Sequence, residues 1–138
     1  MLIDAWIQHP TSRLLKQDMF ASLLRWMGVT EVPEDLPLEV TLGALEAAGV
    51  DRALVCAWHG PTGALITNDE VAAFVRAAPG KLTGVASVDL ARPMVAVREL
   101  RRAVNELGLK ALRMLPWLWN APPDDRRYYP LYAACVDL

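Results

Sequence analysis

The first apolar stretch of the chain ends in side chains that are able to bind a small molecule. Residues 4–9 read DAWIQH, so that Trp6, Gln8 and His9 offer an aromatic surface, an amide and an imidazole. Alternate residues of a strand share a face, which places Trp6 and Gln8 on one face with Asp4. His9 belongs to the opposite face unless the strand ends or bulges there. Either these side chains bind a substrate by stacking and hydrogen bonding, or Trp6 packs in the core and His9 only begins a loop.

Two further polar residues stand where later apolar stretches end. His59 follows LVCAW, where it could exchange a proton with a substrate near neutral pH or face solvent in a loop. Asp89 ends the stretch GVASVD, where it is either a catalytic carboxylate or the cap of the helix that Pro93 helps to start. Both His59 and Asp89 are candidate catalytic residues.

Arg113 lies inside the apolar segment KALRML. An unpaired guanidinium is costly to bury, so we expect an acidic partner for Arg113 or a place at the mouth of a site. Its N–H groups suit a substrate carboxylate, which makes Arg113 a third candidate catalytic residue. Trp117 and Trp119 follow in a proline-rich loop, where they could line a substrate pocket, seal a rim or cover a sheet edge. The candidate substrate-binding residues are Trp6, Gln8, His9 and Trp117.

Strand-like and helix-like patterns alternate along the chain and position these residues. Apolar runs predict four strands, over residues 1–6, 52–58, 81–89 and 109–115. Helical spacing of apolar residues predicts helices over 18–28, 38–49, 68–80 and 93–108, and a last helix within 124–138. Asp18 and Asn68 are expected as N-caps, and Pro130 fits either the first turn of the last helix or a kink. The helix over 18–28 either packs in the core or serves as a lid.

The predicted fold class is α/β, with about four parallel β/α units in a single domain over residues 1–138. The second to fourth strands begin about every 30 residues, which is the size of a βαβ unit. Such apolar strands belong in a sheet that is covered on both faces. Four units make about half of a (β/α)8 barrel, which typically needs roughly 250 residues. The chain is therefore either a small open sheet or the front half of a barrel whose remainder is absent.

The composition excludes several classes of function. Apolar residues make up 54% of the chain and charged residues 22%, and the net charge is −2, so no basic surface for nucleic acid is expected. No apolar stretch approaches the roughly 20 residues that span a bilayer. The N-terminus lacks the basic region of a secretion signal. Cys56 and Cys135 lie in apolar runs without metal-ligand spacing, which predicts buried, reduced thiols in a cytoplasmic protein.

Several segments together resemble the amidohydrolase-related TIM-barrel family, the group that includes the aminocarboxymuconate-semialdehyde decarboxylase type and assorted lactone and amide hydrolases. The resemblance covers nearly the whole chain and rests on the segments IDAWIQH, LEAAGVDRALV, GVASVD, NELGLKALRMLPW and YYPLYAACVDL. It implies a (β/α)8 barrel, of which this chain would supply the first four strands and their helices.

The chain departs from the pattern of this family at the first strand. Members usually carry Asp-x-His-x-His there, because two imidazoles at alternate strand positions can hold one metal ion. The corresponding residues here are Asp4, Trp6 and Gln8, and His9 is offset by one residue. The resemblance implies a divalent metal cofactor for the family, but this chain presents no complete metal site, so its cofactor stays unknown.

The resemblance implies a small-molecule hydrolase or decarboxylase that acts on a carboxylated ring or a lactone. A metal cation would polarise a carbonyl or activate water, and without metal Arg113 and His59 would supply the electrostatics and the proton transfer. One alternative is a truncated, non-catalytic half-barrel that acts as an association module, because unpaired edge strands favour homo-oligomers. Another is an independent open α/β binding domain, although no Gly-rich phosphate loop follows the first strand.

Overall fold

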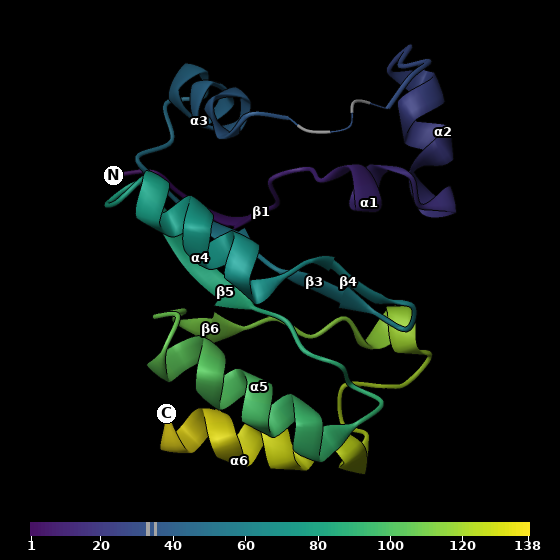
Figure 1. Ribbon diagram of the computed structural model, residues 1–138, viewed down its shortest axis with the longest axis vertical. Coiled ribbons are helices and arrows are strands. Elements are labelled where there is room, and N and C mark those ends of the chain that lie inside the picture. Colours follow the sequence, from purple (N-terminus) through teal and green to yellow (C-terminus); the bar gives the residue numbers. More distant parts are fainter. Residues whose placement is uncertain (33, 35) are drawn as a thin grey trace.

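Four parallel strands form the central sheet of the computed structural model, which describes residues 1–32, 34 and 36–138 (Figure 1). In sheet order they are β1 (Ile3–Ile7), β2 (Arg52–Cys56), β5 (Leu82–Ala86) and β6 (Ala111–Leu112). Every neighbouring pair in this sheet is parallel. The sheet curls as half of a barrel, with helices between its strands. The predicted α/β fold class, with parallel β/α units as in the first half of a TIM barrel, is confirmed.

Helices connect the strands, as parallel neighbours require. The principal helices are α3 (Leu38–Ala47), α4 (Asn68–Ala77), α5 (Pro93–Asn105) and α6 (Tyr129–Asp137), of which α6 packs beside α5 (Figure 1). The shorter ones are α1 (Ser12–Leu15) and α2 (Asp18–Trp26), with the 3-10 turns η1 (Pro116–Trp119) and η2 (Arg126–Tyr128). Pro130 lies in the first turn of α6, where its missing N–H costs nothing, so no kink is needed.

The helices cover one face of the sheet, and Gly84 of β5 identifies that face. A Cβ placed on Gly84 would clash with Leu109 and lie 3.1 Å from Val71 of α4, so this position points at the helical layer. Successive residues of a strand alternate, and Val85 therefore points away from α4. We call the face opposite the helices the concave face. It carries Trp6, Cys56, Val85 and Arg113.

The structure departs from the predicted elements at two strand ends. The segment after β2 is not a loop, because β3 (Trp58–Gly60) and β4 (Gly63–Ile66) pair as an antiparallel hairpin. The fourth strand of the sheet, β6, covers two residues rather than 109–115. Arg113 therefore follows this strand instead of lying inside it, although its N–H still donates to Ala86 O at 2.7 Å.

Two predicted N-caps are wrong by one residue. The cap of α4 is Thr67 rather than Asn68, because Thr67 Oγ1 accepts from Glu70 N at 3.1 Å while the Glu70 carboxylate accepts from Thr67 N at 2.8 Å. This reciprocal pair is a capping box, which satisfies two backbone donors at once. The cap position of α2 belongs to Gln17 rather than Asp18.

Burial differs from the prediction at one helix and one thiol. No residue of α2 is fully buried and Trp26 is 87% exposed, so most of this helix lacks the expected core packing. Phe20 is the exception, because it is partly buried against the core and meets the Trp58 ring edge-on at 6.0 Å. The lid interpretation of α2 stays a prediction. Cys56 is buried as expected, whereas Cys135 is exposed on α6.

Candidate active site

Arg113 lies between two indole rings on the concave face. Its Cζ is 4.2 Å from the centroid of the Trp6 ring and 4.6 Å from that of the Trp58 ring, which is within the range of cation–π attraction. The side-chain oxygen of Gln8, with the amide oriented to suit its neighbours, accepts from Arg113 Nη1 at 2.9 Å and also from Trp6 Nε1. We call these four residues, Trp6, Gln8, Trp58 and Arg113, the Arg113 cluster.

Three separate segments bring the Arg113 cluster together. Trp6 lies in β1 and Gln8 directly follows it, so that the two side chains share a face as the two-residue period predicts. Trp58 begins β3 and Arg113 follows β6. Trp6 is 59% exposed, so the interpretation that it packs in the core is wrong.

The Arg113 guanidinium is partly withdrawn from water and incompletely paired. Its Nε and Nη2 atoms are buried, and neither has a hydrogen-bond partner within the part of the chain that the structure describes. Burial lowers the pKa of Arg113 from its usual value, and the neighbouring Cys56 opposes this. Arginine nevertheless stays protonated at neutral pH, so a cation with two free N–H groups remains to attract an anion.

An open cavity of about 320 Å³ lies on the concave face beside Arg113. Its lining is otherwise apolar or neutral, and it includes Trp6, Leu54, Cys56, Val85, Met114 and Arg113. Burial raises the pKa of the Cys56 thiol above its ordinary value, so this side chain is uncharged at neutral pH. Arg113 is thus the single charge among the residues that line this cavity.

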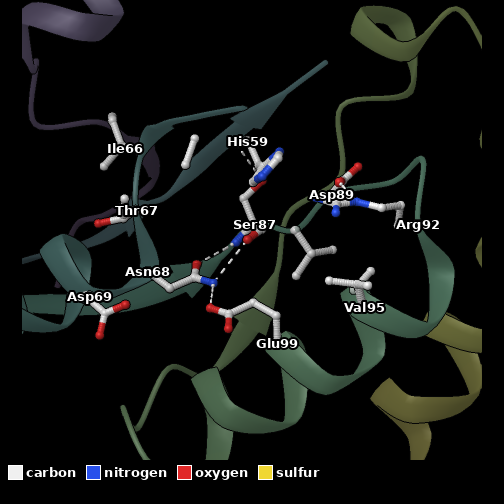
Figure 2. Close-up of a pocket in the computed structure, with 13 residues that line it drawn as sticks. His59, Ile66, Thr67, Asn68, Asp69, Ser87, Asp89, Arg92, Val95 and Glu99 are labelled. Atoms are coloured by element: carbon white, nitrogen blue, oxygen red, sulfur yellow. Dashed lines mark hydrogen bonds and ion pairs between the residues drawn. The ribbon is translucent and has the colours of Figure 1, made fainter. Parts of the chain in front are cut away.

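A second pocket, of about 260 Å³, lies between the hairpin and the first turns of α4 and α5 (Figure 2). His59 N donates to Ser87 Oγ at 3.1 Å, which ties the hairpin to the segment after β5. Asn68 holds the same segment, because its Nδ2 donates to Ser87 O at 3.1 Å and its Oδ1 accepts from Ser87 N at 2.9 Å. Asn68 Nδ2 also donates to Glu99 of α5 at 2.8 Å. We call this the His59 pocket.

Asp89 lines the His59 pocket, but it is not the predicted cap of α5. Arg92 takes the cap position, and the Asp89 carboxylate instead accepts from Ala91 N at 3.0 Å and from Arg92 Nε at 2.6 Å. Burial acts to raise the pKa of Asp89, but these bonds and the nearby Arg92 and His59 lower it overall. Asp89 is therefore ionised near neutral pH, and Arg92 already neutralises much of its charge.

His9 and Trp117 lie outside the Arg113 cluster. His9 is buried, with Nδ1 2.9 Å from Thr41 Oγ1 and Nε2 2.8 Å from Leu36 O, so both ring nitrogens have partners within the fold. Trp117 is 63% exposed and meets the Trp58 ring edge-on at 6.5 Å, at the rim of the cluster. Trp117 therefore contacts the cluster only through Trp58, whereas the hydrogen bonds of His9 connect the end of β1 to α3 and to the segment before it.

The candidate residues form two groups rather than one shared rim. Trp6, Gln8 and Arg113 belong to the Arg113 cluster, while His59 and Asp89 line the His59 pocket. Trp58 and His59 are consecutive on β3, so their side chains point to opposite sides of that strand. All these residues stand at or beyond the carboxyl ends of parallel strands, but the hairpin divides them.

Sequence reasoning missed Trp58, Asn68 and Ser87 as parts of these two sites. The signal for Trp58 was available, because it lies two residues beyond Cys56 and shares its face if the strand continues. Asn68 was interpreted as a helix cap, and nothing local distinguishes it from one. Ser87 carries no sequence signal, since its partners are 19 and 28 residues away.

A comparison with protein-family models shows which family this chain belongs to. Residues 29–138 match the family model described as Amidohydrolase. The chain belongs to the amidohydrolase family. A search of curated proteins found no match. The predicted relationship to amidohydrolase-related TIM-barrel proteins is confirmed.

Solved structures agree with this assignment. An uncharacterised TIM-barrel protein, Bb4693 from Bordetella bronchiseptica, is 26% identical with a TM-score of 0.72, over 99% of this chain and 52% of its own. The 5-carboxyvanillate decarboxylase LigW2 from Novosphingobium aromaticivorans, solved with manganese and 3-methoxy-4-hydroxy-5-nitrobenzoic acid, is 18% identical with a TM-score of 0.71, over 99% and 48%. The 4-oxalomesaconate hydratase LigJ from Rhodopseudomonas palustris is 18% identical with a TM-score of 0.65, over 99% and 49%.

This amidohydrolase chain spans about half the length of those solved relatives. Its fold is that of half of their barrel. Among the helices that the structure describes, none combines the length and the hydropathy needed to cross a bilayer.

The first strand of this amidohydrolase chain does not fit a divalent metal. Trp6 and Gln8 stand where the family pattern has two histidines, and both side chains contact Arg113 instead. Within the described residues, no three His, Cys, Asp or Glu side chains are grouped so that they could hold a metal ion. An indole is not a zinc or manganese ligand, and the oxygen of Gln8 is already used by two donors.

Proposed function

We propose that this chain supplies the amino-terminal half of an amidohydrolase-type active site for a small carboxylated ring or lactone, which is decarboxylated or hydrolysed. The observation that carries the proposal is Arg113, a protonated guanidinium with two free N–H groups beside a cavity on the concave face. Active sites of barrel enzymes lie at the carboxyl ends of the strands, where Arg113 stands.

The chemistry of the Arg113 cluster suits a flat, negatively charged ring. The guanidinium would hold the carboxylate in one orientation, while the exposed rings of Trp6 and Trp117 would border the substrate ring. A general acid or base is still needed to move a proton, and His59 and Asp89 remain the candidates in this half of the barrel. Two of the solved relatives are named as a decarboxylase and a hydratase. Those reactions are properties of those proteins, and for this chain they support only the proposed class of substrate.

Turnover measurements on matched variants test this proposal. Release of CO₂ from hydroxylated benzoates and opening of carboxylated lactones are measured for the protein, for Arg113→Gln and for the control Arg98→Gln. Arg98 is exposed on the outer side of α5 and takes no part in either site. We expect Arg113→Gln to lose at least about 100-fold in kcat/KM while Arg98→Gln keeps it, since a charged carboxylate contact is worth a few kcal/mol. Unchanged turnover in Arg113→Gln contradicts the proposal, as does a folded protein that turns over neither class even when it is mixed with a chain that supplies the second half of the barrel.

A second candidate function is association with another copy through the sheet edges. In the described part of the chain, β1 and β6 each pair with one neighbour and leave the other edge open. Ile3 of β1 and Trp6 are 49% and 59% exposed beside one of these edges, which favours a homo-oligomer. Light scattering after size exclusion should then give twice the monomer mass, and a monodisperse monomer would rule this candidate out. We further propose a cytoplasmic location, which the free thiols of Cys56 and Cys135 support.

A further inference from the structure

We propose that Arg113, held by Gln8 and by the rings of Trp6 and Trp58, is a carboxylate-binding site that works without a divalent cation. This inference deepens the proposed function and rests on it, because it concerns the same cavity on the concave face. It adds which edge of the guanidinium receives the ligand, which ring must move, and why metal is not required for binding.

The hydrogen bonds of Arg113 leave one particular edge of its guanidinium free. Gln8 accepts from Nη1, whereas Nε and Nη2 have no partner among the described residues. The N–H bond of Nε and one N–H bond of Nη2 are parallel, and together they match the two oxygens of a carboxylate. A single-point acceptor such as a hydroxyl would satisfy only one of them, so the geometry favours a carboxylate.

The charge of Arg113 points to an anion as well. The ion pairs formed by the described residues do not include Arg113. Two indole faces attract the cation but cannot accept the N–H bonds that lie in its plane. A partly buried cation with open donors gains more from an incoming carboxylate than a solvated one would.

The two rings differ in their freedom to move, which indicates how a ligand enters. Nε and Nη2 are shielded from solvent, so a ligand must displace a ring to reach them. Trp58 is buried, at 6% exposure, whereas Trp6 is 59% exposed and borders the cavity. Trp6 is therefore the ring that swings aside, and its fluorescence should report binding.

The same contacts make a divalent cation unnecessary and electrostatically unfavourable beside Trp6 and Gln8. Trp6 and Gln8 replace the two imidazoles of the family pattern, and the oxygen of Gln8 is turned toward Arg113. A divalent ion held by the residues at positions 6 and 8 would lie beside a guanidinium, where like charges repel. The guanidinium therefore supplies the positive charge for carboxylate binding itself.

Binding measurements with benzoate test this inference on the full chain. Tryptophan fluorescence and calorimetry are followed with benzoate and with benzamide, its neutral analogue, in the presence of a chelator and again with manganese. We expect benzoate to bind on the order of 10-fold or more tightly than benzamide, with the same Kd in chelator and in manganese. Equal binding of the two ligands, or benzoate binding that requires manganese, would overturn the inference without any variant.

Variants of Arg113 test whether this residue itself binds the benzoate. Arg113→Gln should lose benzoate binding by on the order of 10- to 100-fold, and Arg113→Lys should recover only part, because the ammonium lacks the parallel N–H pair. Arg98→Gln is the matched control and should bind like the parent. Circular dichroism checks the folding of each variant, and a folded Arg113→Gln with parental benzoate affinity would contradict the inference.

The outcomes for binding and for turnover are separable. Benzoate binding that needs no metal, in a protein without turnover, would remove the proposed function and leave this site. Manganese-dependent benzoate binding would remove the metal-free site and leave a carboxylated-ring enzyme possible.

Discussion

At the scale of single residues, Arg113 shows most clearly what the sequence predicts and what only the structure reveals. An arginine in an apolar segment was expected to have an acidic partner or to reach the mouth of a site, and it does the second. Its neighbours could not be predicted by proximity, because Gln8 and Trp58 lie 105 and 55 positions before it in the chain. Only the shared face of Trp6 and Gln8 followed from the period of a strand.

The two thiols should react differently. Cys135 is exposed and Cys56 is buried against the concave face, and burial raises the pKa of both. Labelling with a thiol reagent at neutral pH should modify Cys135 alone in the folded protein, and Cys56 only on unfolding. The labelling rate of Cys135 should rise with pH above the ordinary thiol range, since the thiolate is the reacting form. Equal rates for both thiols would contradict the assigned burial.

At the scale of elements, local signals decided the helices better than the short strands. The helices predicted over 38–49 and 93–108 each end at a glycine, and Gly49 and Gly108 do adopt φ of 67° and 75° there. The capping box Thr67-x-x-Glu70 was readable from the sequence and would have corrected the cap of α4. The hairpin was not readable, because strands of three and four residues carry too little periodicity to be told from a loop.

Gly84 should be intolerant of larger side chains because β5 lies close to α4. Gly84→Val would place its methyl groups against Leu109 and Val71, and overpacking of this kind costs about 1–3 kcal/mol in the free energy of unfolding. Gly43→Ala is the control, since nothing lies within 4 Å of its added Cβ and α3 should gain about 0.5–1 kcal/mol. Urea denaturation compares both with the parent, and a Gly84→Val protein of parental stability would contradict the packing.

Arg102 joins α4 to α5, and this link should make stability sensitive to acid. Arg102 donates to Asp69 at 2.6 Å and to Glu99 at 2.8 Å. Hydrogen bonding from Arg102 is the largest cause that holds the pKa of Glu99 below its ordinary 4.5, although burial opposes it. A lowered pKa in the folded state stabilises at neutral pH, and that stability is lost as the pH falls below 4.5 and through the folded pKa.

Arg102→Gln should therefore be less stable than the parent at neutral pH, by up to about 1 kcal/mol because the pairs are partly solvated. The difference should shrink as the solution is acidified, whereas Arg98→Gln should match the parent throughout. Urea denaturation across this pH range makes the comparison. A deficit that grows in acid would contradict the assigned pairing.

At the scale of the whole molecule, the predicted half-barrel is the part that the sequence supported most fully. Strand, helix and glycine recur in order, and each recurrence became one β/α unit of the parallel sheet. The candidate residues at these strand ends do not meet in one site, because an unpredicted hairpin stands between the Arg113 cluster and the His59 pocket. Spatial order of strands could be inferred from chain order, but the direction of each side chain at the rim could not.

The single domain over residues 1–138 remains a prediction that unfolding can test. Contacts between β1 and β2, between β2 and β5, and between α5 and α6 connect the chain from end to end. We therefore expect one cooperative thermal transition, with fluorescence and circular dichroism giving the same midpoint. Two separate transitions would show that the chain divides into independent units.

A crystal structure of this chain with benzoate tests the carboxylate site at Arg113 most directly. We expect the two carboxylate oxygens within hydrogen-bond distance of Arg113 Nε and Nη2, with the ring of Trp6 moved aside and Gln8 still bonded to Nη1. Benzoate bound beside Ser87 in the His59 pocket, or held through a metal ion with Arg113 untouched, would contradict it.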